Sequence, residues 1–302
     1  MRFSFWVNNS QGWDEILATS RHAAATGWDG VWVADHFMPN AEDVSGPMHE
    51  AWSLVAGLAA AVERVRIGVL VSGNTYRHPA VLAKAAATAD HISGGRVVLG
   101  LGAGWQENEH ERYGIEFSTV GGRLDRLEEA CEVVTRLFTE ERVTFAGEHY
   151  QLTDAPLEPK PVQSPLPLLI GGGGEKRTMR IAARFAQEWN VWGTPDVLRH
   201  KNGVLDAHCH DVGRDPGEIR RSCQGLLFLF DNEAKAEEMR QRDIGRAALV
   251  GTPEQLVEVV AAYRDAGVDE LIVPDFTLPQ GAAKREVMDT FIEQVAAPFR
   301  DR

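Results

Sequence analysis

Short apolar runs alternate with longer amphipathic segments along most of this chain, and this alternation limits the possible folds more than any other feature. Residues 30–34 (GVWVA), 65–71 (VRIGVLV) and 97–101 (VVLGL) are apolar with little polar alternation. Such runs are typical of strands buried on both faces, which occur in parallel sheets covered by helices. We therefore expect repeated strand–helix units.

About eight such units fit into the chain, which is typical of a single (β/α)8 TIM barrel. An open doubly wound sheet has the same periodicity, but no GxGxxG follows the first predicted strand. The predicted strands are residues 3–7, 30–34, 65–71, 97–101, 166–170, 188–191, 226–230 and 270–273. The predicted helices include residues 13–26, ended by Gly27, 49–62, 80–92, 122–140 and 253–266, capped by Thr252. We interpret residues 1–302 as one α/β domain.

Residues 143–167 break the rhythm, because they contain five prolines and few helix-forming residues. The segment TFAGEHYQL predicts a short hairpin, and the following PLEPKPVQSPLP is too rich in proline for a helix. We interpret residues 143–167 as an insertion after the fourth helix. It either covers the mouth of the barrel or decorates the surface, and the pattern leaves both open.

The formal net charge of −13 limits the partners of the protein. An acidic surface repels the phosphates of nucleic acids and of anionic membranes, so we expect neither as a partner. No apolar run reaches the roughly 18 residues of a membrane helix, and the first residues, MRFSFWVNNSQGWDE, do not resemble a signal peptide. The three cysteines form no CxxC pair. These features predict a cytoplasmic protein.

Polar, small and aromatic residues follow several of the predicted strands. In a (β/α)8 barrel the carboxyl ends of all strands meet on one rim, which carries the functional residues. The residues at these places are Asp35, His36, Ser72, Gly73, Asn74, the run 102–105 (GAGW) with Asn108 and Glu109, four glycines from Gly171 to Gly174, and the run 189–192 (WNVW). Their concentration on one rim predicts the functional site.

Four successive glycines, Gly171, Gly172, Gly173 and Gly174, form the sharpest local signal. Between a strand and a helix they permit positive φ and let backbone N–H groups converge on an anion. The dipole of the following helix, expected to begin near Glu175, adds to the attraction. A tight turn needs only one glycine, so we predict a phosphate-binding loop.

Asp35 and His36 directly follow the second predicted strand. A histidine titrates near neutral pH and can relay a proton during a reaction. In the alternative, Asp35 caps the next segment and His36 is a satisfied polar group, and the pattern leaves both open. For Glu109 we favour a structural role, paired with Arg112 or with a backbone amide.

No metal site is predicted. His208 and His210 are two residues apart on a predicted helix, so they do not share a face. The chain has no HExxH motif, no GxSxG motif and no P-loop.

Residues 78–117 (HPAVLAKAAATADHISGGRVVLGLGAGWQENEHERYGIEF) resemble the luciferase-like monooxygenase superfamily, and more narrowly its coenzyme F420-dependent branch. Residues 32–36 (WVADH) and 165–190 (PLPLLIGGGGEKRTMRIAARFAQEWN) add to the resemblance, which covers the chain up to Trp192. It implies a TIM barrel that is often dimeric, so we expect a homodimer with a small-molecule substrate.

The resemblance also implies roles for single residues. Asp35, Asn108 and the four-glycine loop match positions that bind the cofactor, which is coenzyme F420 or, in the alternative, FMN. In F420-using relatives the third strand ends in a bulge with a non-proline cis peptide, and Ser72–Gly73 occupies that position here. His36 aligns with the catalytic histidine of F420-dependent sugar-phosphate dehydrogenases. Trp105 stands where those enzymes carry a glutamate, which argues against a sugar phosphate as substrate.

Three functions follow as hypotheses. The first is an F420-dependent oxidoreductase that transfers a hydride between the deazaflavin C5 and a small organic substrate, with His36 managing the proton. The second is an FMN-dependent monooxygenase of the same fold. The third is a non-catalytic protein that binds a flavin or deazaflavin. In the first, Trp6, Trp105 and Trp192 either wall an apolar substrate pocket or pack the barrel rim.

Overall fold

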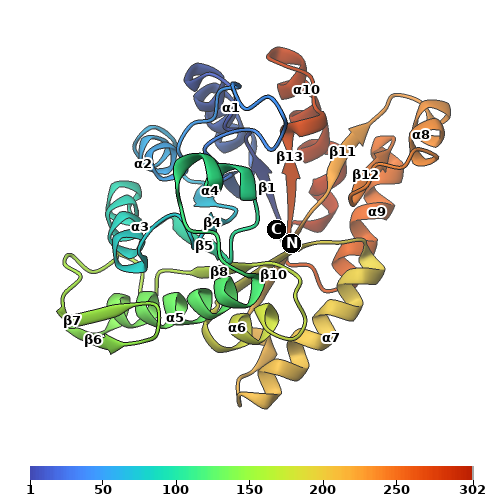
Figure 1. Cartoon of the computed structure of the whole chain (residues 1–302). Coiled ribbons are helices and arrows are strands. Elements are labelled where there is room, and N and C mark those ends of the chain that lie inside the picture. Colours follow the sequence, from blue (N-terminus) through green and yellow to red (C-terminus); the bar gives the residue numbers. More distant parts are fainter. Residues whose placement is uncertain (301–302) are drawn as a thin grey trace.

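Eight parallel strands form a closed barrel at the centre of the computed structural model, which describes residues 1–300 (Figure 1). Each barrel strand pairs with the next one along the chain, and the last pairs with the first. In chain order the strands are β1 (Arg2–Trp6), β2 (Gly30–Val33), β3 (Arg66–Val69), β5 (Val97–Gly102), β8 (Leu168–Gly171), β9 (Glu188–Trp192), β10 (Arg220–Gln224) and β13 (Glu270–Pro274). The predicted (β/α)8 barrel is confirmed.

Helices surround the barrel, as Figure 1 shows. They are α1 (Trp13–Thr26), α2 (Ala51–Ala61), α3 (Pro79–Ser93), α5 (Val120–Thr139), α6 (Thr178–Phe185), α7 (Pro195–Asp211), α9 (Pro253–Asp265) and α10 (Ala282–Thr290), with the short α4 (Glu107–Tyr113) and α8 (Glu233–Arg240) in loops. The predicted signals at two helix ends are confirmed. Gly27 ends α1 with a φ of 97°, and Thr252 caps α9 in a capping box with Gln255. Within residues 1–300 no helix has both the length and the apolarity to cross a membrane.

The amino-terminal end of the barrel is closed by an ion cluster. Arg66 bonds to Glu188, and its Nη1 lies 2.9 Å from Oε2 of Glu270. The other oxygen of Glu270 accepts a hydrogen bond of 3.1 Å from Nε1 of Trp32. Burial raises the pKa of Glu188, and Arg66 opposes this rise. These paired charges fill the barrel interior at its amino-terminal end, while the cavity described below lies at the carboxyl ends of the strands.

The seventh barrel strand differs from the prediction. The sequence favoured residues 226–230 (LLFLF), but β10, five residues of sequence RRSCQ, lies between β9 and β13. The apolar run forms β11 (Leu226–Leu229), which pairs with β12 (Ala248–Gly251) in a separate two-stranded parallel sheet. The prediction was wrong because β10 is polar: its buried Ser222 and Gln224 make hydrogen bonds inside the barrel instead of apolar contacts.

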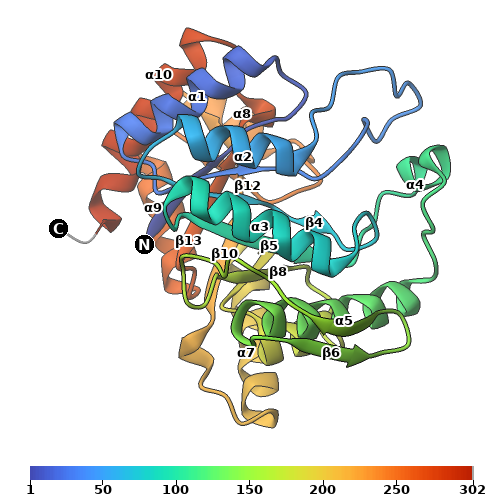
Figure 2. The ribbon, with the colours of Figure 1, turned by 90° about the vertical axis from the view of Figure 1, so that its left-hand side faces the viewer.

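The insertion 143–167 contains the predicted hairpin, formed by β6 (Val143–Ala146) and β7 (Gln151–Ala155), paired antiparallel. Figure 2 shows this hairpin lying along α5 on the outside of the barrel. None of residues 143–167 is among those that line the main cavity described below. The arrangement therefore corresponds to the surface alternative, not to a cover over the mouth.

Candidate active site

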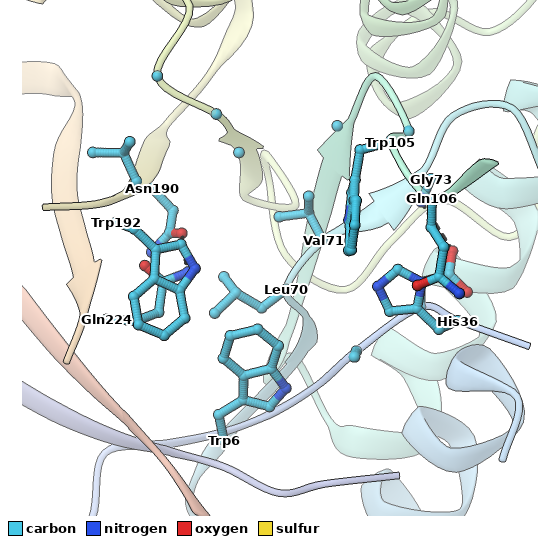
Figure 3. Close-up of a pocket in the computed structure, with 18 of the residues that line it drawn as sticks. Trp6, His36, Leu70, Val71, Gly73, Trp105, Gln106, Asn190, Trp192 and Gln224 are labelled. Carbon is cyan, nitrogen blue, oxygen red and sulfur yellow. Dashed lines mark hydrogen bonds between the residues drawn. The ribbon is translucent and has the colours of Figure 1, made fainter. Parts of the chain in front are cut away.

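A cavity of about 1080 Å3 lies at the carboxyl ends of the barrel strands (Figure 3). Its volume lies slightly above the usual range for small-molecule sites, about 300–1,000 Å3. Its walls come from the segments that follow most of the barrel strands. The predicted site residues that line it are Asp35, His36, Ser72, Gly73, Gly171, Gly172 and Gly173. Residues that the sequence assigned to one rim therefore surround one cavity.

His36 is held at the edge of this cavity by Glu109. Nδ1 of His36 lies 2.9 Å from Oε1 of Glu109, and the Glu109 side chain is completely buried. Among residues 1–300, Nε2 of His36 has no hydrogen-bond partner, and the side chain is 21% exposed. The ring of Trp105 meets the imidazole edge-on, with 5.4 Å between the ring centroids. Fixed through one nitrogen, His36 can exchange a proton with a ligand through the other.

Glu109 binds three groups at once. Besides His36 it accepts a hydrogen bond of 2.7 Å from the backbone N–H of Phe37 and one from the hydroxyl of Tyr76. Burial by itself raises the pKa of Glu109, but the hydrogen bonds from these three groups outweigh it and bring the pKa below its ordinary value. Burial beside this carboxylate raises the pKa of Tyr76. Glu109 is therefore an ionised anchor for the loop that carries His36.

Sequence reasoning assigned Glu109 a structural role with Arg112 or a backbone amide as partner. The backbone amide is that of Phe37, while the contact with His36 was missed. Glu109 lies on α4, which Figure 2 shows beyond the ends of the strands. The two residues follow β2 and β5, which are not adjacent in the barrel. The sequence contained one indication of this contact, since it placed an acidic residue and a histidine on the same predicted rim.

Asp35 lines the cavity with its carboxylate already bound by protein groups. Arg77 donates two hydrogen bonds of 2.7 and 2.9 Å to its two oxygens, and the N–H of Gly73 donates a third of 3.0 Å. Arg77 also bonds to Glu50. Burial raises the pKa of Asp35, and Arg77 opposes the rise. Asp35 thus fixes the chain after β3 in place.

The non-proline cis peptide lies between Leu70 and Val71, two residues before the expected Ser72–Gly73. The prediction placed the bond wrongly because the resemblance fixes the bulge only approximately. Ser72 begins the short strand β4 (Ser72–Gly73), which pairs with β5, and its buried hydroxyl accepts a hydrogen bond of 3.0 Å from Nε1 of Trp52. Both Leu70 and Val71 line the cavity, so the bulge forms part of its floor.

Glycines make room for the bulged Val71. A Cβ atom on Gly102 would lie 2.7 Å from a Val71 methyl group, and one on Gly171 would lie 2.8 Å from two of them. Both distances are shorter than real carbon contacts. Two of the glycines on the rim are therefore required by packing under the cavity floor.

The four-glycine loop faces the cavity with three of its members, while Gly174 does not line it. Gly172 has a φ of 127°, a conformation that other residues rarely adopt. Among residues 1–300, the N–H groups of Gly173 and Gly174 donate to no protein acceptor. The following helix α6 begins at Thr178, three residues later than expected, because residues 175–177 form a turn.

Basic side chains near this loop are partly neutralised. Arg177 lies 2.6 Å from Asp125, and Lys201 donates hydrogen bonds to the carbonyl of Gly173 (2.8 Å) and to Glu175 (2.6 Å). The loop itself thus presents backbone N–H groups rather than free cations to the cavity. Such groups suit a phosphate.

Asn108 lies outside the lining of the cavity. Its Nδ2 donates a hydrogen bond of 3.1 Å to the carbonyl of Pro39. Gln106, two residues earlier, lines the cavity instead and donates to the carbonyl of Met38 at 3.0 Å. Sequence reasoning missed Gln106, because the loop pattern does not show which of two neighbouring amides turns inward.

Aromatic side chains form much of the remaining wall. Trp6, Trp105 and Trp192 all line the cavity, together with Phe276. The centroids of Trp6 and Phe276 are 5.0 Å apart, and Trp105 is 58% exposed at the rim. The guanidinium of Arg246, another lining residue, lies 4.9 Å from the Trp192 ring. The three tryptophans therefore wall the cavity, one of the two roles considered for them.

The histidines of α7 lie away from this cavity. Nε2 of His208 bonds to the carbonyl of Glu175 at 2.6 Å, and His200 lies 3.1 Å from the Glu175 carboxylate. Within residues 1–300 no group of three or more histidine, cysteine, aspartate or glutamate side chains is arranged to hold a metal ion.

A model of the luciferase-like monooxygenase family matches residues 1–246. The matched part carries His36, Glu109 and the four-glycine loop. It covers most of the chain and includes seven of the eight barrel strands, all except β13.

Two curated relatives are F420-dependent glucose-6-phosphate dehydrogenases. The protein of Kineococcus radiotolerans is 40% identical over 220 residues, which cover 72% of this chain but only 64% of the relative. The protein of Microbacterium testaceum is 36% identical over the whole of this chain and 98% of its own length. Among solved structures, an F420-dependent secondary alcohol dehydrogenase in complex with an F420–acetone adduct shares the fold, with a TM-score of 0.85 over 99% of both chains at 21% identity.

Proposed function

The chain belongs to the luciferase-like monooxygenase family, and from this premise we propose that it is an oxidoreductase that uses coenzyme F420 to transfer a hydride to or from a small organic substrate. The observation that carries the proposal is the buried Glu109 that holds His36 with one ring nitrogen free at the cavity. A dehydrogenase that oxidises an alcohol needs a group to take the hydroxyl proton, and a histidine at the cavity can do so, which supports His36 in that role.

The cavity suits a deazaflavin with a phosphate-bearing side chain. Within residues 1–300 the N–H groups of Gly173 and Gly174 have no protein acceptor, and Gly173 lines the cavity, so the loop can offer an N–H group to a phosphate there. The bulge at Leu70 and Val71 forms an apolar floor. Gly102 and Gly171 have no side chains, so the Val71 side chain fits against them. We infer that these residues, with Ser72 and Gly73, hold the cofactor. When bound, the cofactor supplies the carbon that accepts or donates the hydride.

The chain's own residues supply the proton transfer and the surroundings. Nε2 of His36 accepts the proton of an alcohol as it is oxidised, or donates one to a carbonyl as it is reduced. Glu109 keeps the imidazole oriented through Nδ1 during both steps. Trp6, Trp105 and Trp192 provide apolar walls around the substrate.

A binding titration of the purified protein with F420 and FMN in parallel tests the proposal. Tight binding of F420 with weak binding of FMN, read from cofactor and tryptophan fluorescence, supports it. The reverse result, with oxygen uptake in the presence of reduced FMN, would replace it by a flavin monooxygenase. A further outcome is a protein that binds F420 but turns over no alcohol, aldehyde or sugar phosphate, with F420 affinity unchanged in His36→Ala. This result would indicate a non-catalytic binding protein.

A further inference from the structure

A chain of buried hydrogen bonds crosses from β9 to β10 below the aromatic wall. The hydroxyl of Ser222 donates to the carbonyl of Trp189 at 3.3 Å and accepts from Nδ2 of Asn190 at 2.9 Å. Oδ1 of Asn190 accepts in turn from Nε2 of Gln224 at 2.7 Å. The carbonyl of Trp189 can only accept, so it fixes which group donates in each hydrogen bond of this series. The last group, Oε1 of Gln224, is therefore an acceptor.

Oε1 of Gln224 is buried and, within residues 1–300, accepts no hydrogen bond. The Gln224 side chain is only 3% exposed and lines the cavity, as does Asn190. A buried polar atom without a partner costs free energy, and most such atoms in folded proteins find one. Nothing in the proposed proton transfer uses this atom. It is placed to accept a hydrogen bond from a ligand in the cavity.

The surroundings restrict the chemistry of that ligand. Trp192 pairs with Gln224 in the β9–β10 register, and its ring lies beside that of Trp6, with 6.3 Å between centroids. Nε1 of Trp6 is also buried without a partner among the described residues, so the same wall holds one free donor as well as one free acceptor. An anion has no hydrogen to donate to Oε1 of Gln224, and the guanidinium of Arg246, 4.9 Å from the Trp192 ring, disfavours a second cation there. A neutral hydroxyl group both donates and accepts.

This wall lies opposite His36. Strand β9 is four strands round the eight-stranded barrel from β2, which precedes His36. Figure 3 shows Asn190, Gln224 and Trp192 on one side of the cavity and His36 on the other, with Leu70 and Val71 between them. A ligand that spans the cavity therefore meets His36 at one end and Gln224 at the other.

We propose that Gln224, held in place by Asn190, forms a substrate-recognition subsite that accepts a hydrogen bond from a neutral hydroxyl group of the substrate, with Nε1 of Trp6 as a hydrogen-bond donor in the same wall. The proposal rests on the proposed function, because it takes the ligand to be the substrate that reacts at His36. The same chemistry is present in the polyol side chain of the cofactor, so the test has to separate the two sources.

Cyclohexanol and cyclohexanone are a matched pair of probes, since the ring is shared and only the alcohol can donate a hydrogen bond. Both are titrated into the protein, with and without F420, and tryptophan fluorescence or ligand NMR gives the dissociation constants. We expect the wild type to bind the alcohol about fivefold more tightly than the ketone. Equal binding of the two probes by the wild type overturns the proposal without any variant.

Variants then assign the preference. Gln224→Met keeps the length of the side chain but removes the acceptor, and should abolish the preference for the alcohol. Trp6→Phe keeps an aromatic ring but removes the donor, and should weaken the ketone as well as the alcohol. A Gln224→Met protein that is folded by circular dichroism and retains the preference contradicts the proposal. So does one that keeps the preference but loses F420 affinity, since Gln224 would then serve the cofactor.

The outcomes also separate this proposal from the proposed function. If the protein does not bind F420 but still prefers the alcohol, the proposed function is wrong, while the subsite for a hydroxyl group stands. Tight F420 binding with no alcohol preference removes the subsite and leaves the function.

Discussion

Nδ1 of His36 lies 2.9 Å from Oε1 of Glu109, although the two residues are 73 positions apart in the chain and follow different barrel strands. The contact joins a half-buried residue at the cavity to a completely buried carboxylate. It gives the imidazole a fixed orientation before any ligand is bound. Four of the predictions below concern this pair or the packing beneath the cavity.

His36→Asn should lower kcat by roughly 100- to 10,000-fold, the usual contribution of a general acid or base. F420 affinity should change little, because His36 is proposed to act on the substrate proton. Steady-state kinetics with the substrate found by screening, together with F420 fluorescence titration, measure the two effects separately. An F420 affinity lowered as strongly as kcat would place His36 in the cofactor site instead.

Glu109→Gln should lower kcat by about 10- to 100-fold through loss of the oriented imidazole, as for other groups that orient a functional histidine. Since Glu109 acts through His36, the double variant with His36→Asn should be no slower than His36→Asn alone. Tyr76→Phe is the matched control, because it removes another hydrogen bond to the same carboxylate but leaves the His36 contact. Independent, multiplicative effects of the first two variants would contradict a shared role.

The stability contributed by Glu109 should depend on pH. Its pKa in the folded protein lies below the ordinary value of 4.5, because hydrogen bonds outweigh burial. The contribution is therefore complete above the unfolded pKa and is lost as pH falls through the folded pKa. Urea denaturation of wild type and Glu109→Gln should show a constant difference in free energy of unfolding above about pH 5.5 and a shrinking one below 4.5. A difference in free energy of unfolding that grows as the pH falls would contradict a lowered pKa of Glu109 in the folded protein.

Gly102→Ala should destabilise the protein by about 1–3 kcal/mol, because its Cβ would lie 2.7 Å from a Val71 methyl group. Val71→Ala in the same chain should restore much of this loss, since the next nearest atom is a carbonyl oxygen 3.6 Å away. Gly100→Ala is the contrasting case: its Cβ would lie 2.0 Å from the carbonyl oxygen of Val69, which no side-chain change relieves. Thermal and urea denaturation compare the wild type with Gly102→Ala and Gly100→Ala, each alone and combined with Val71→Ala. Equal rescue of both glycine variants by Val71→Ala would be incompatible with this packing.

Lys284→Met should cost about 3–5 kcal/mol, because it leaves the buried carboxylate of Asp275 without its cation, although Asn8 and Gln11 still donate hydrogen bonds to it. Nζ of Lys284 is completely buried, 3.0 Å from Oδ2 of Asp275 and 2.8 Å from Oε1 of Gln11. Adding Asp275→Asn removes the stranded charge, so the double variant should be more stable than Lys284→Met alone. Urea denaturation measures both. A double variant that loses the sum of the two single effects would show that the ion pair contributes nothing as a pair.

The sequence by itself determined the barrel, the end of α1, the cap of α9 and the rim on which the candidate site lies. Apolar runs, Gly27 after α1 and the four glycines after β8 act through local backbone and burial preferences, which the order of residues expresses directly. The same local preferences led to the wrong prediction of the seventh barrel strand. There the polar β10 takes the place in the barrel, because its buried Ser222 and Gln224 make hydrogen bonds with β9 that local apolarity does not reveal.

Only the tertiary structure decided which polar residues meet. Closing the barrel brings His36 to Glu109, binds Asp35 to Arg77 and turns Gln106 inward in place of Asn108. It also leaves Oε1 of Gln224 without a partner among residues 1–300. These partnerships depend on strand order and on side-chain directions across the ring. Local periodicity carries no information about them, because a residue's face on its own strand does not say which distant residue lies opposite.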